Sequence, residues 1–361
     1  MRRLVPAAVT AALLAGGPAH AQDITSEIDR MFSWATSGTP GCGVGVSRHG
    51  QVLVNRVYGM ADLERGVALT PETAFDVGSV VKQFVAASVL LLVDEGRISL
   101  SDDVRKYIPE LPDYGHVITI DHLLTHTSGI RDWVWLSSVT EYRENALTLI
   151  LRQRGLNFAP GEEWSYSNSG YELLREVVAR VSGQPLAEFM RTRLFEPLGM
   201  RSTRYARDAS EVPNHALAYE KQGEQWRVDM LLGNARGGGG GVFSTAGDLL
   251  IWNDALTSSR LGAFVSEKIQ EPARLRNGRK LDYARGLMLD GEGEDEIVWH
   301  SGDAAAYNAI LARLPKQGVS LALLCNGGEV TDDGNYEVAI IDLLVPAPGA
   351  GAAAGPEPAA A

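Results

Sequence analysis

The sequence predicts an α+β fold, in which one antiparallel sheet formed by both chain ends is flanked by helices and a mostly helical lobe is inserted between the ends. Strand-like runs lie near the start of the mature chain, similar runs return after residue 283, and helical patterns fill the middle. Strands separated by so long an insertion can share one core by pairing in a single sheet. An active site where two such lobes meet is expected.

The first 21 residues are typical of a secretory signal peptide. Arg2 and Arg3 precede an apolar run over residues 4–14, and Ala19-His20-Ala21 offers small residues for cleavage before Gln22. The run is too short to span a bilayer. An ordinary N-terminal helix is the alternative interpretation. We expect the mature chain to be periplasmic or secreted, with no membrane insertion after signal cleavage.

The mature chain opens with an amphipathic pattern that predicts a helix over 24–35, followed by two strands at 43–47 and 52–58. From Ser79 to Glu95 the pattern is that of a long helix closed by Gly96. Its middle is apolar on nearly every face, which predicts a buried central helix.

Helical segments and loops fill the next stretch, and the chain has no internal repeat. Helical patterns cover 171–182, 184–195 and 245–256, strand-like runs cover 283–289, 296–300, 308–314 and 319–325, and a final helix is expected near 336–344. The predicted domain, 22–345, divides into an α/β lobe (about 22–78 and 245–345) and a helical lobe (about 79–244). Residues 346–361 are almost entirely Pro, Gly and Ala, which predicts a disordered tail.

Composition and charge exclude some partners. The 361 residues are 45% hydrophobic and 22% charged, which is ordinary for a globular protein. The net charge of −12 argues against nucleic acid or an anionic membrane surface as a partner. An anionic substrate would gain no long-range attraction and would need a local positive anchor.

The first candidate for chemistry is Ser79-Val80-Val81-Lys82, at the start of the predicted buried helix. Residues three apart share a helix face, so the Lys82 amine can reach the Ser79 hydroxyl. The helix N-terminus favours a developing negative charge, and apolar neighbours would lower the pKa of Lys82 toward that of a useful base. A helix cap with an extended surface lysine is the structural alternative.

The second candidate is Tyr166-Ser167-Asn168, in a loop just before a helix. Tyr166, as tyrosinate or neutral phenol, can relay a proton to a leaving group, and the Asn168 amide can hold a substrate carbonyl. A helix-capping loop rich in Ser and Asn would have the same composition.

The third candidate is His300-Ser301-Gly302, at the predicted end of a strand. A strand edge with a glycine lets a substrate lie alongside the backbone. The N–H of the next residue, Asp303, can then join that of Ser79 as an oxyanion hole. His300 alone is equally consistent with a half-buried strand histidine.

In this order, the three segments resemble the serine beta-lactamase and penicillin-binding superfamily. More closely, the chain resembles the branch that holds class C beta-lactamases, D-alanyl-D-alanine carboxypeptidases, D-amino-acid peptidases and related esterases. Four further stretches support the match: 123–129 (LLTHTSG), 158–161 (FAPG), 197–200 (PLGM) and 240–246 (GGVFSTA). The resemblance covers about 25–345 and implies a beta-lactamase/transpeptidase-like fold.

The resemblance implies that Ser79 is acylated, that Lys82 takes or relays its proton, and that Tyr166 is the partner acid or base. It implies that Asn168 and the segment from His300 to Asp303 bind the substrate. It implies a two-step reaction on a small-molecule or peptide substrate, with no metal and no cofactor.

One departure from the family pattern concerns His300. Class C beta-lactamases mostly carry a lysine there, which helps to anchor a substrate carboxylate. Histidine with an ordinary pKa is largely neutral at pH 7, so this anchor is weaker. We therefore expect cleavage of D-amino-acid-containing peptides or small esters. Hydrolysis of beta-lactam antibiotics is the second possibility, and a penicillin-binding or scaffold protein that is acylated without turnover is the third.

Other enzyme classes find no support, because the sequence has neither G-x-S-x-G nor H-E-x-x-H. His126 is a possible base, but the resemblance gives its loop an architectural role. Trp133 and Trp135 could either form a pocket wall or simply pack.

The only two cysteines, Cys42 and Cys325, lie just before the first predicted strand and at the end of the last. If those strands pair antiparallel, the cysteines lie opposite each other, which predicts a disulfide. Otherwise, both are expected to be small buried hydrophobic residues.

Overall fold

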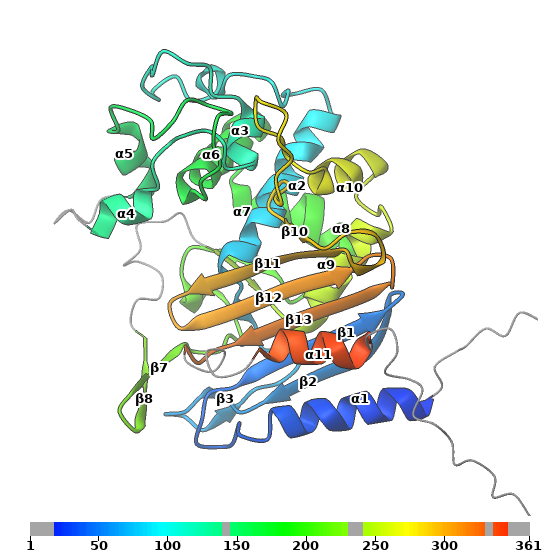
Figure 1. Ribbon diagram of the computed structural model, residues 1–361. Coiled ribbons are helices and arrows are strands. Elements are labelled where there is room, and N and C mark those ends of the chain that lie inside the picture. The colour runs from blue at the N-terminus through cyan, green and yellow to red at the C-terminus, as the bar shows by residue number, and fades with distance from the viewer. Residues whose placement is uncertain (1–17, 139–144, 230–240, 329–334, 346–361) are drawn as a thin grey trace, which may run out of the picture.

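The computed structural model describes residues 18–138, 145–229, 241–328 and 335–345, with side chains from residue 24 on. Its centre is a six-stranded antiparallel sheet with the strand order β10-β11-β12-β13-β1-β2 (Figure 1). The strands are β1 Cys42–Arg48, β2 Gln51–Tyr58, β10 Met288–Asp290, β11 Ile297–Ala304, β12 Tyr307–Leu314 and β13 Val319–Cys325. Both chain ends therefore contribute to one sheet, and the predicted fold class is confirmed.

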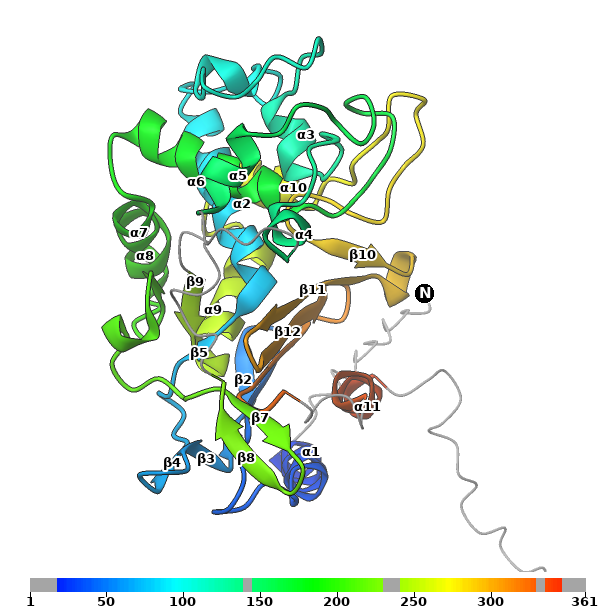
Figure 2. The same cartoon turned by 90° about the vertical axis from the view of Figure 1, so that its left-hand side faces the viewer.

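Helices cover both faces of this sheet. Helices α1 (Pro18–Met31) and α11 (Tyr336–Leu344) pack on one face, and α9 (Ala246–Thr257) packs on the other (Figure 2). Because β1 and β13 are covered on both sides, they are buried along almost their whole length. A side chain at Gly45 would come within 3.2 Å of Ala246, so glycine permits the close approach of α9 to β1.

The helical lobe is arranged around α2 (Val81–Asp94), which is buried along most of its length and is entered through the short 3₁₀ helix η1 (Gly78–Val80). Its other helices are α3 Ile120–Leu124, α4 Trp133–Ser138, α5 Ala146–Leu151, α6 Asn168–Ser182, α7 Leu186–Met190 and α8 Glu196–Leu198, with a π-helical turn at Arg191–Phe195. Helix α10 (Ala263–Gln270) packs against α2 from the later part of the chain.

Small strands connect the lobes. Strands β5 (Phe75–Asp76), β9 (Gly241–Ser244) and β6 (Arg204–Ala206) form a three-stranded sheet in the order β5-β9-β6. Two hairpins pair β3 (Met60–Asp62) with β4 (Val67–Ala68) and β7 (Tyr219–Gln222) with β8 (Gln225–Val228). The sequence analysis did not identify these short strands or α10.

Several predicted boundaries need correction. The run 283–289 is not a strand: only Met288–Asp290 is, because Gly286 has φ +76° and its turn lies against the backbone of Lys82 and Gln83. Strand β11 does not end at His300 but continues to Ala304. Helix α1 ends at Met31, and it begins at Pro18, inside the predicted signal peptide.

Residues 1–17 and 346–361, which hold most of the predicted signal peptide and the whole predicted tail, lie outside the described residues. Within the described residues, no helix combines the length and hydrophobicity that crossing a membrane requires.

The predicted disulfide is confirmed. Cys42 pairs with Cys325 in the antiparallel register of β1 and β13, and a disulfide joins the two across 283 positions of sequence. Both residues are fully buried within the cluster that α1 and α11 form with the sheet. The bond therefore connects the first and last strands of the sheet at its core.

We expect the Cys42–Cys325 bond to stabilise the protein by about 4 kcal/mol or less, because it restricts the unfolded chain. Urea unfolding of the wild type with and without dithiothreitol measures this difference. A Cys42→Ala/Cys325→Ala variant is the control, since the reductant should not change its stability. Two free thiols in the denatured, unreduced wild type would contradict the assignment.

Candidate active site

The turn before α2 presents Ser79 at the junction of the two lobes. Strand β5 ends at Asp76, whose Oδ1 accepts a hydrogen bond from the Gly78 N–H at 2.9 Å. Gly78 has φ +51°, a conformation that favours glycine, and the chain then enters η1 and α2. Ser79 is half-buried within this first turn, so its hydroxyl lies near the N-terminal end of the buried helix.

Lys82 lies one turn further along and contacts Ser79 directly. Its Nζ donates hydrogen bonds to Ser79 Oγ and to Asn168 Oδ1, both at 2.9 Å. The side chain is buried, with 3% of its surface exposed. The pKa of Lys82 is lowered to about 7, chiefly by burial and also by the nearby charge of Arg175, against the opposing effect of Asp132 and Glu172. A neutral amine is therefore well populated at neutral pH.

Tyr166 completes this cluster. Its hydroxyl lies close enough to Ser79 to interact with it, and its ring centroid lies 4.7 Å from Lys82 Nζ. Burial raises the pKa of Tyr166 above its usual range, although the interaction with Ser79 opposes this increase. Of the two forms that the sequence left open, the neutral phenol is the one that this environment favours.

Asn168 is held by a residue that the sequence analysis did not identify. The Asp132 carboxylate accepts hydrogen bonds from Asn168 Nδ2 at 2.9 Å and from the Asn168 backbone N–H at 3.1 Å. These bonds fix the orientation of the amide, so that its oxygen faces Lys82. Asp132 follows the 123–129 motif by three residues, but Asn168 is 36 positions further along the chain. No local sequence pattern connects the two residues, so this contact could not be predicted.

Strand β11 approaches the Ser79 turn through two glycines. A side chain at Gly302 would lie 2.0 Å from the Val77 carbonyl oxygen and 3.0 Å from the Ser79 nitrogen, and one at Gly78 would lie 2.6 Å from the Asp303 nitrogen. Only glycine permits this contact. It brings the backbone nitrogens of Ser79 and Asp303 into one neighbourhood, as the predicted oxyanion hole requires.

The outer edge of β11 is open where it passes this turn. Strand β10 pairs only with residues 297–299 of β11, and within the described residues no other strand pairs with the edge beyond Trp299. Alternation in the β11–β12 hairpin directs the N–H groups of Ser301 and Asp303 toward that edge. The edge is thus available to an extended substrate.

His300 is deeply buried, with 1% of its surface exposed, and is not at a strand end. The pKa of His300 is lowered to about 4, chiefly by burial and also by the charge of Lys82, against the opposing effect of the Ser301 backbone. The imidazole is therefore neutral near pH 7, which makes it a weaker anion anchor than a histidine with an ordinary pKa.

A buried tyrosine connects His300 with His126. The Ser167 N–H donates to His126 Nδ1 at 3.1 Å, so the His126 proton lies on Nε2, 3.0 Å from the Tyr283 hydroxyl. His300 Nδ1 faces the Ser301 carbonyl, which can only accept. His300 Nε2 is then an acceptor, 3.4 Å from the Tyr283 hydroxyl. The sequence analysis did not identify Tyr283, because it placed this residue in a strand.

The two tryptophans that follow this loop differ in environment. Trp133 belongs to the buried core and its backbone N–H donates to Ser169 Oγ at 2.9 Å, whereas Trp135 is 75% exposed. Trp133 therefore packs rather than forming a pocket wall. Within the described residues, no group of three or more His, Cys, Asp or Glu side chains could hold a metal ion.

Comparison with known proteins identifies the family. The profile of the beta-lactamase family, described as Beta-lactamase, matches residues 22–344. The chain belongs to the beta-lactamase family. It is therefore a serine hydrolase of the beta-lactamase-related type, and the resemblance stated from the motifs is confirmed.

Individual relatives within the beta-lactamase family differ in name and length. The chain is 31% identical to Penicillin-binding protein 4* of Bacillus subtilis (strain 168), over 81% of this chain and 68% of that protein. Across three such curated relatives it spans between 54% and 68% of their length.

Solved structures of similar proteins show the same fold. The octameric penicillin-binding protein homologue from Pyrococcus abyssi has a TM-score of 0.71 and 25% identity, over 84% of this chain and 73% of that one. The D-amino acid amidase from Ochrobactrum anthropi SV3 has a TM-score of 0.68 and 23% identity, over 90% of this chain and 97% of that one.

We expect Tyr283→Phe to lower the free energy of unfolding of this beta-lactamase-family protein by about 1–3 kcal/mol, because the buried His126 Nε2–H loses its acceptor. Tyr58→Phe is the matched control, since the Tyr58 hydroxyl donates to Asp29 in an exposed pair and should contribute less. Urea unfolding of both variants gives the comparison. Equal effects of the two substitutions would contradict a special role for the buried hydroxyl.

Proposed function

We propose that this protein cleaves D-amino-acid-containing peptides, as a D,D-carboxypeptidase or D-peptidase does, or small esters, through an acyl-enzyme on Ser79. The observation that carries the proposal is the hydrogen bond between Ser79 Oγ and the buried amine of Lys82, with the Tyr166 hydroxyl close to the same serine. A nucleophile, a base with a lowered pKa and a phenol that can relay a proton are the groups that acyl transfer needs.

In the acylation step, Ser79 Oγ attacks the substrate carbonyl carbon as its proton passes to the neutral amine of Lys82. The negative charge moves to the carbonyl oxygen, which the backbone N–H groups of Ser79 and Asp303 stabilise. The bond to the leaving group then breaks, and the leaving nitrogen or oxygen takes a proton from Tyr166, which Lys82 replenishes. The acyl-enzyme ester and the free amine or alcohol account for all atoms and charges.

In the deacylation step, water replaces the leaving group. Its proton passes through Tyr166 to Lys82 as its oxygen attacks the ester carbon. When the tetrahedral intermediate collapses, Ser79 Oγ leaves and recovers a proton from Lys82, which returns to the neutral amine. The product is a carboxylic acid, and the Asn168 amide, fixed by Asp132, would bind the acyl amide through its side chain.

The neutral state of His300 favours substrates whose leaving group carries no carboxylate, such as small esters and peptide amides, over beta-lactams. A substrate whose recognition depends on a carboxylate at this position would find an uncharged imidazole there. The names of two similar proteins, a penicillin-binding protein and a D-amino acid amidase, agree with the proposed substrate class. Beta-lactam hydrolysis and acylation without turnover are the other outcomes of the test below.

We also propose that the protein is exported after removal of residues 1–21. The Cys42–Cys325 disulfide supports this location, because such bonds persist mainly in the periplasm or outside the cell.

We expect a short-chain aryl ester and a D-Ala-D-Ala peptide to be hydrolysed faster than a chromogenic cephalosporin, and Ser79→Ala to abolish all of this activity. Steady-state rates on the three substrates, with and without the substitution, provide the measurement. Ser88→Ala is a matched control, since Ser88 is buried on the same helix and its hydroxyl bonds only the Phe84 carbonyl. If Ser79 is acylated stoichiometrically and the acyl group is not released, the protein is acylated without turnover. If Ser79 is not acylated at all, both hydrolysis and acylation without turnover are excluded.

The pH dependence should follow Lys82. Because the folded protein holds its pKa at about 7 and the base must be neutral, kcat/KM should rise through pH 7 and fall about tenfold for each unit below pH 6. His300, with a pKa of about 4, stays neutral across this range. His300→Gln should therefore leave the position of the acid limb unchanged. If the acid limb of the kcat/KM profile disappeared in His300→Gln, His300 and not Lys82 would be the titrating group.

A further inference from the structure

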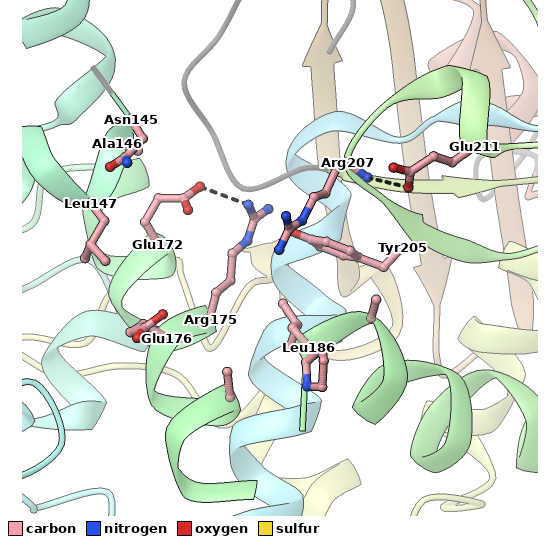
Figure 3. Close-up of a pocket in the computed structure, with 13 residues that line it drawn as sticks. Asn145, Ala146, Leu147, Glu172, Arg175, Glu176, Leu186, Tyr205, Arg207 and Glu211 are labelled. Atoms are coloured by element: carbon pink, nitrogen blue, oxygen red, sulfur yellow. Dashed lines mark hydrogen bonds and ion pairs between the residues drawn. The ribbon is translucent and has the colours of Figure 1, made fainter. Parts of the chain in front are cut away.

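A pocket of about 710 Å³ lies in the helical lobe, between α5, α6, the start of α7 and the segment that includes the end of β6 and the residues after it (Figure 3). Its volume is that of a typical small-molecule site. Its lining includes Glu172, Arg175, Tyr205, Arg207 and Glu211.

Helix α6 connects this pocket with Asn168, because residues of both lie along one of its faces. Asn168, Glu172, Arg175 and Ala179 recur at intervals of three or four residues and so lie on the same side of the helix. Asn168 contacts Lys82, and the last three line the pocket. Side chains on a helix lean toward its N-terminus, which brings the Arg175 guanidinium back toward Asn168. Its charge acts on both Lys82 and Asp76.

Two guanidinium groups meet at one phenol in this pocket. Arg175 has its Cζ 5.6 Å from the Tyr205 ring centroid and 13% of its side chain exposed. In Figure 3 the Arg207 side chain runs beside Tyr205, with its guanidinium directed to the Arg175 side. Both positive charges act on the Tyr205 hydroxyl, where they oppose the increase in pKa that burial causes.

The acidic side chains of the pocket have other partners. Glu172 pairs with Arg175 at 2.9 Å, Glu176 pairs with Arg180 at 2.6 Å, and Glu211 accepts from the Arg207 backbone N–H at 3.2 Å. Among the residues that the structure describes, no carboxylate forms an ion pair with the Arg207 guanidinium. A cation thus faces a cavity that is large enough for part of a substrate.

We propose that this pocket binds a carboxylate on the acyl part of the substrate, with Arg207 as its anchor beside Arg175, which is itself paired with Glu172; the inference rests on the proposed acyl transfer at Ser79. The leaving group takes its proton from Tyr166, whose ring lies 6.1 Å from that of His300, so it lies on the His300 side. The acyl part then extends the other way, past Asn168 and along α6. Arginine suits this role because its planar fork binds carboxylates in two-point contacts.

The test compares p-nitrophenyl half-esters of glutaric, adipic and suberic acid with p-nitrophenyl esters of the corresponding uncharged alkanoic acids. At least one half-ester should have a kcat/KM about tenfold above that of its uncharged partner in the wild type. Arg207→Gln should remove this preference and leave the uncharged esters within about twofold. Arg204→Gln is the matched control, because Arg204 is exposed on β6 but alternates to the face opposite Tyr205 and does not line the pocket.

A wild type with no preference for any half-ester would overturn the proposal, and so would equal losses in Arg207→Gln and Arg204→Gln. If no ester is cleaved, the ester part of the proposed function fails, and binding still tests the pocket. Calorimetric titration of adipate and suberate should show binding to the wild type and to Arg204→Gln but not to Arg207→Gln. Failure of both dicarboxylates to bind the wild type would overturn the inference by itself.

Discussion

The antiparallel pairing of β1 with β13 is the constraint on which the rest of the molecule depends. Strands β10 to β12 reach the N-terminal strands only through β13, so this one ladder joins the two ends of the chain. Once it forms, β11 is held beside the turn that begins α2. The contact between Gly302 and Gly78 then becomes possible, and Ser79 and the open strand edge share one site.

Burial of Lys82 is the second requirement, because it determines the charge state of the centre. The amine lies in a helix that is apolar on nearly all sides, and desolvation disfavours its protonated form. Asn168 compensates in part by accepting from the amine, and Asp132 holds that amide in place from a separate loop. The helical lobe inserted between the strands therefore sets the protonation state of Lys82, whereas the sheet contributes the open edge of β11.

The periodic parts of the fold followed from the sequence, and the parts set by tertiary contacts did not. Strands β1, β2, β12 and β13 have alternating or uniformly apolar sequences that are long enough to predict strands. The antiparallel pairing of β1 with β13 places Cys42 opposite Cys325. The segment around Tyr283 has the same apolar composition, but Gly286 turns it against α2, so composition alone predicted the wrong structure. The roles of Asp132 and Arg175 were also not predicted. Each depends on a partner that is distant in sequence, and a single charged residue gives no local pattern.

The covalent bond between Cys42 and Cys325 also affects how the protein tolerates damage. The bond encloses both lobes and every catalytic side chain considered above, from Ser79 to Asp303. A protease that cuts one exposed loop of the helical lobe would leave two pieces that cannot diffuse apart. The severed ends would stay near each other while the sheet remains intact, so a nicked molecule can keep its site assembled.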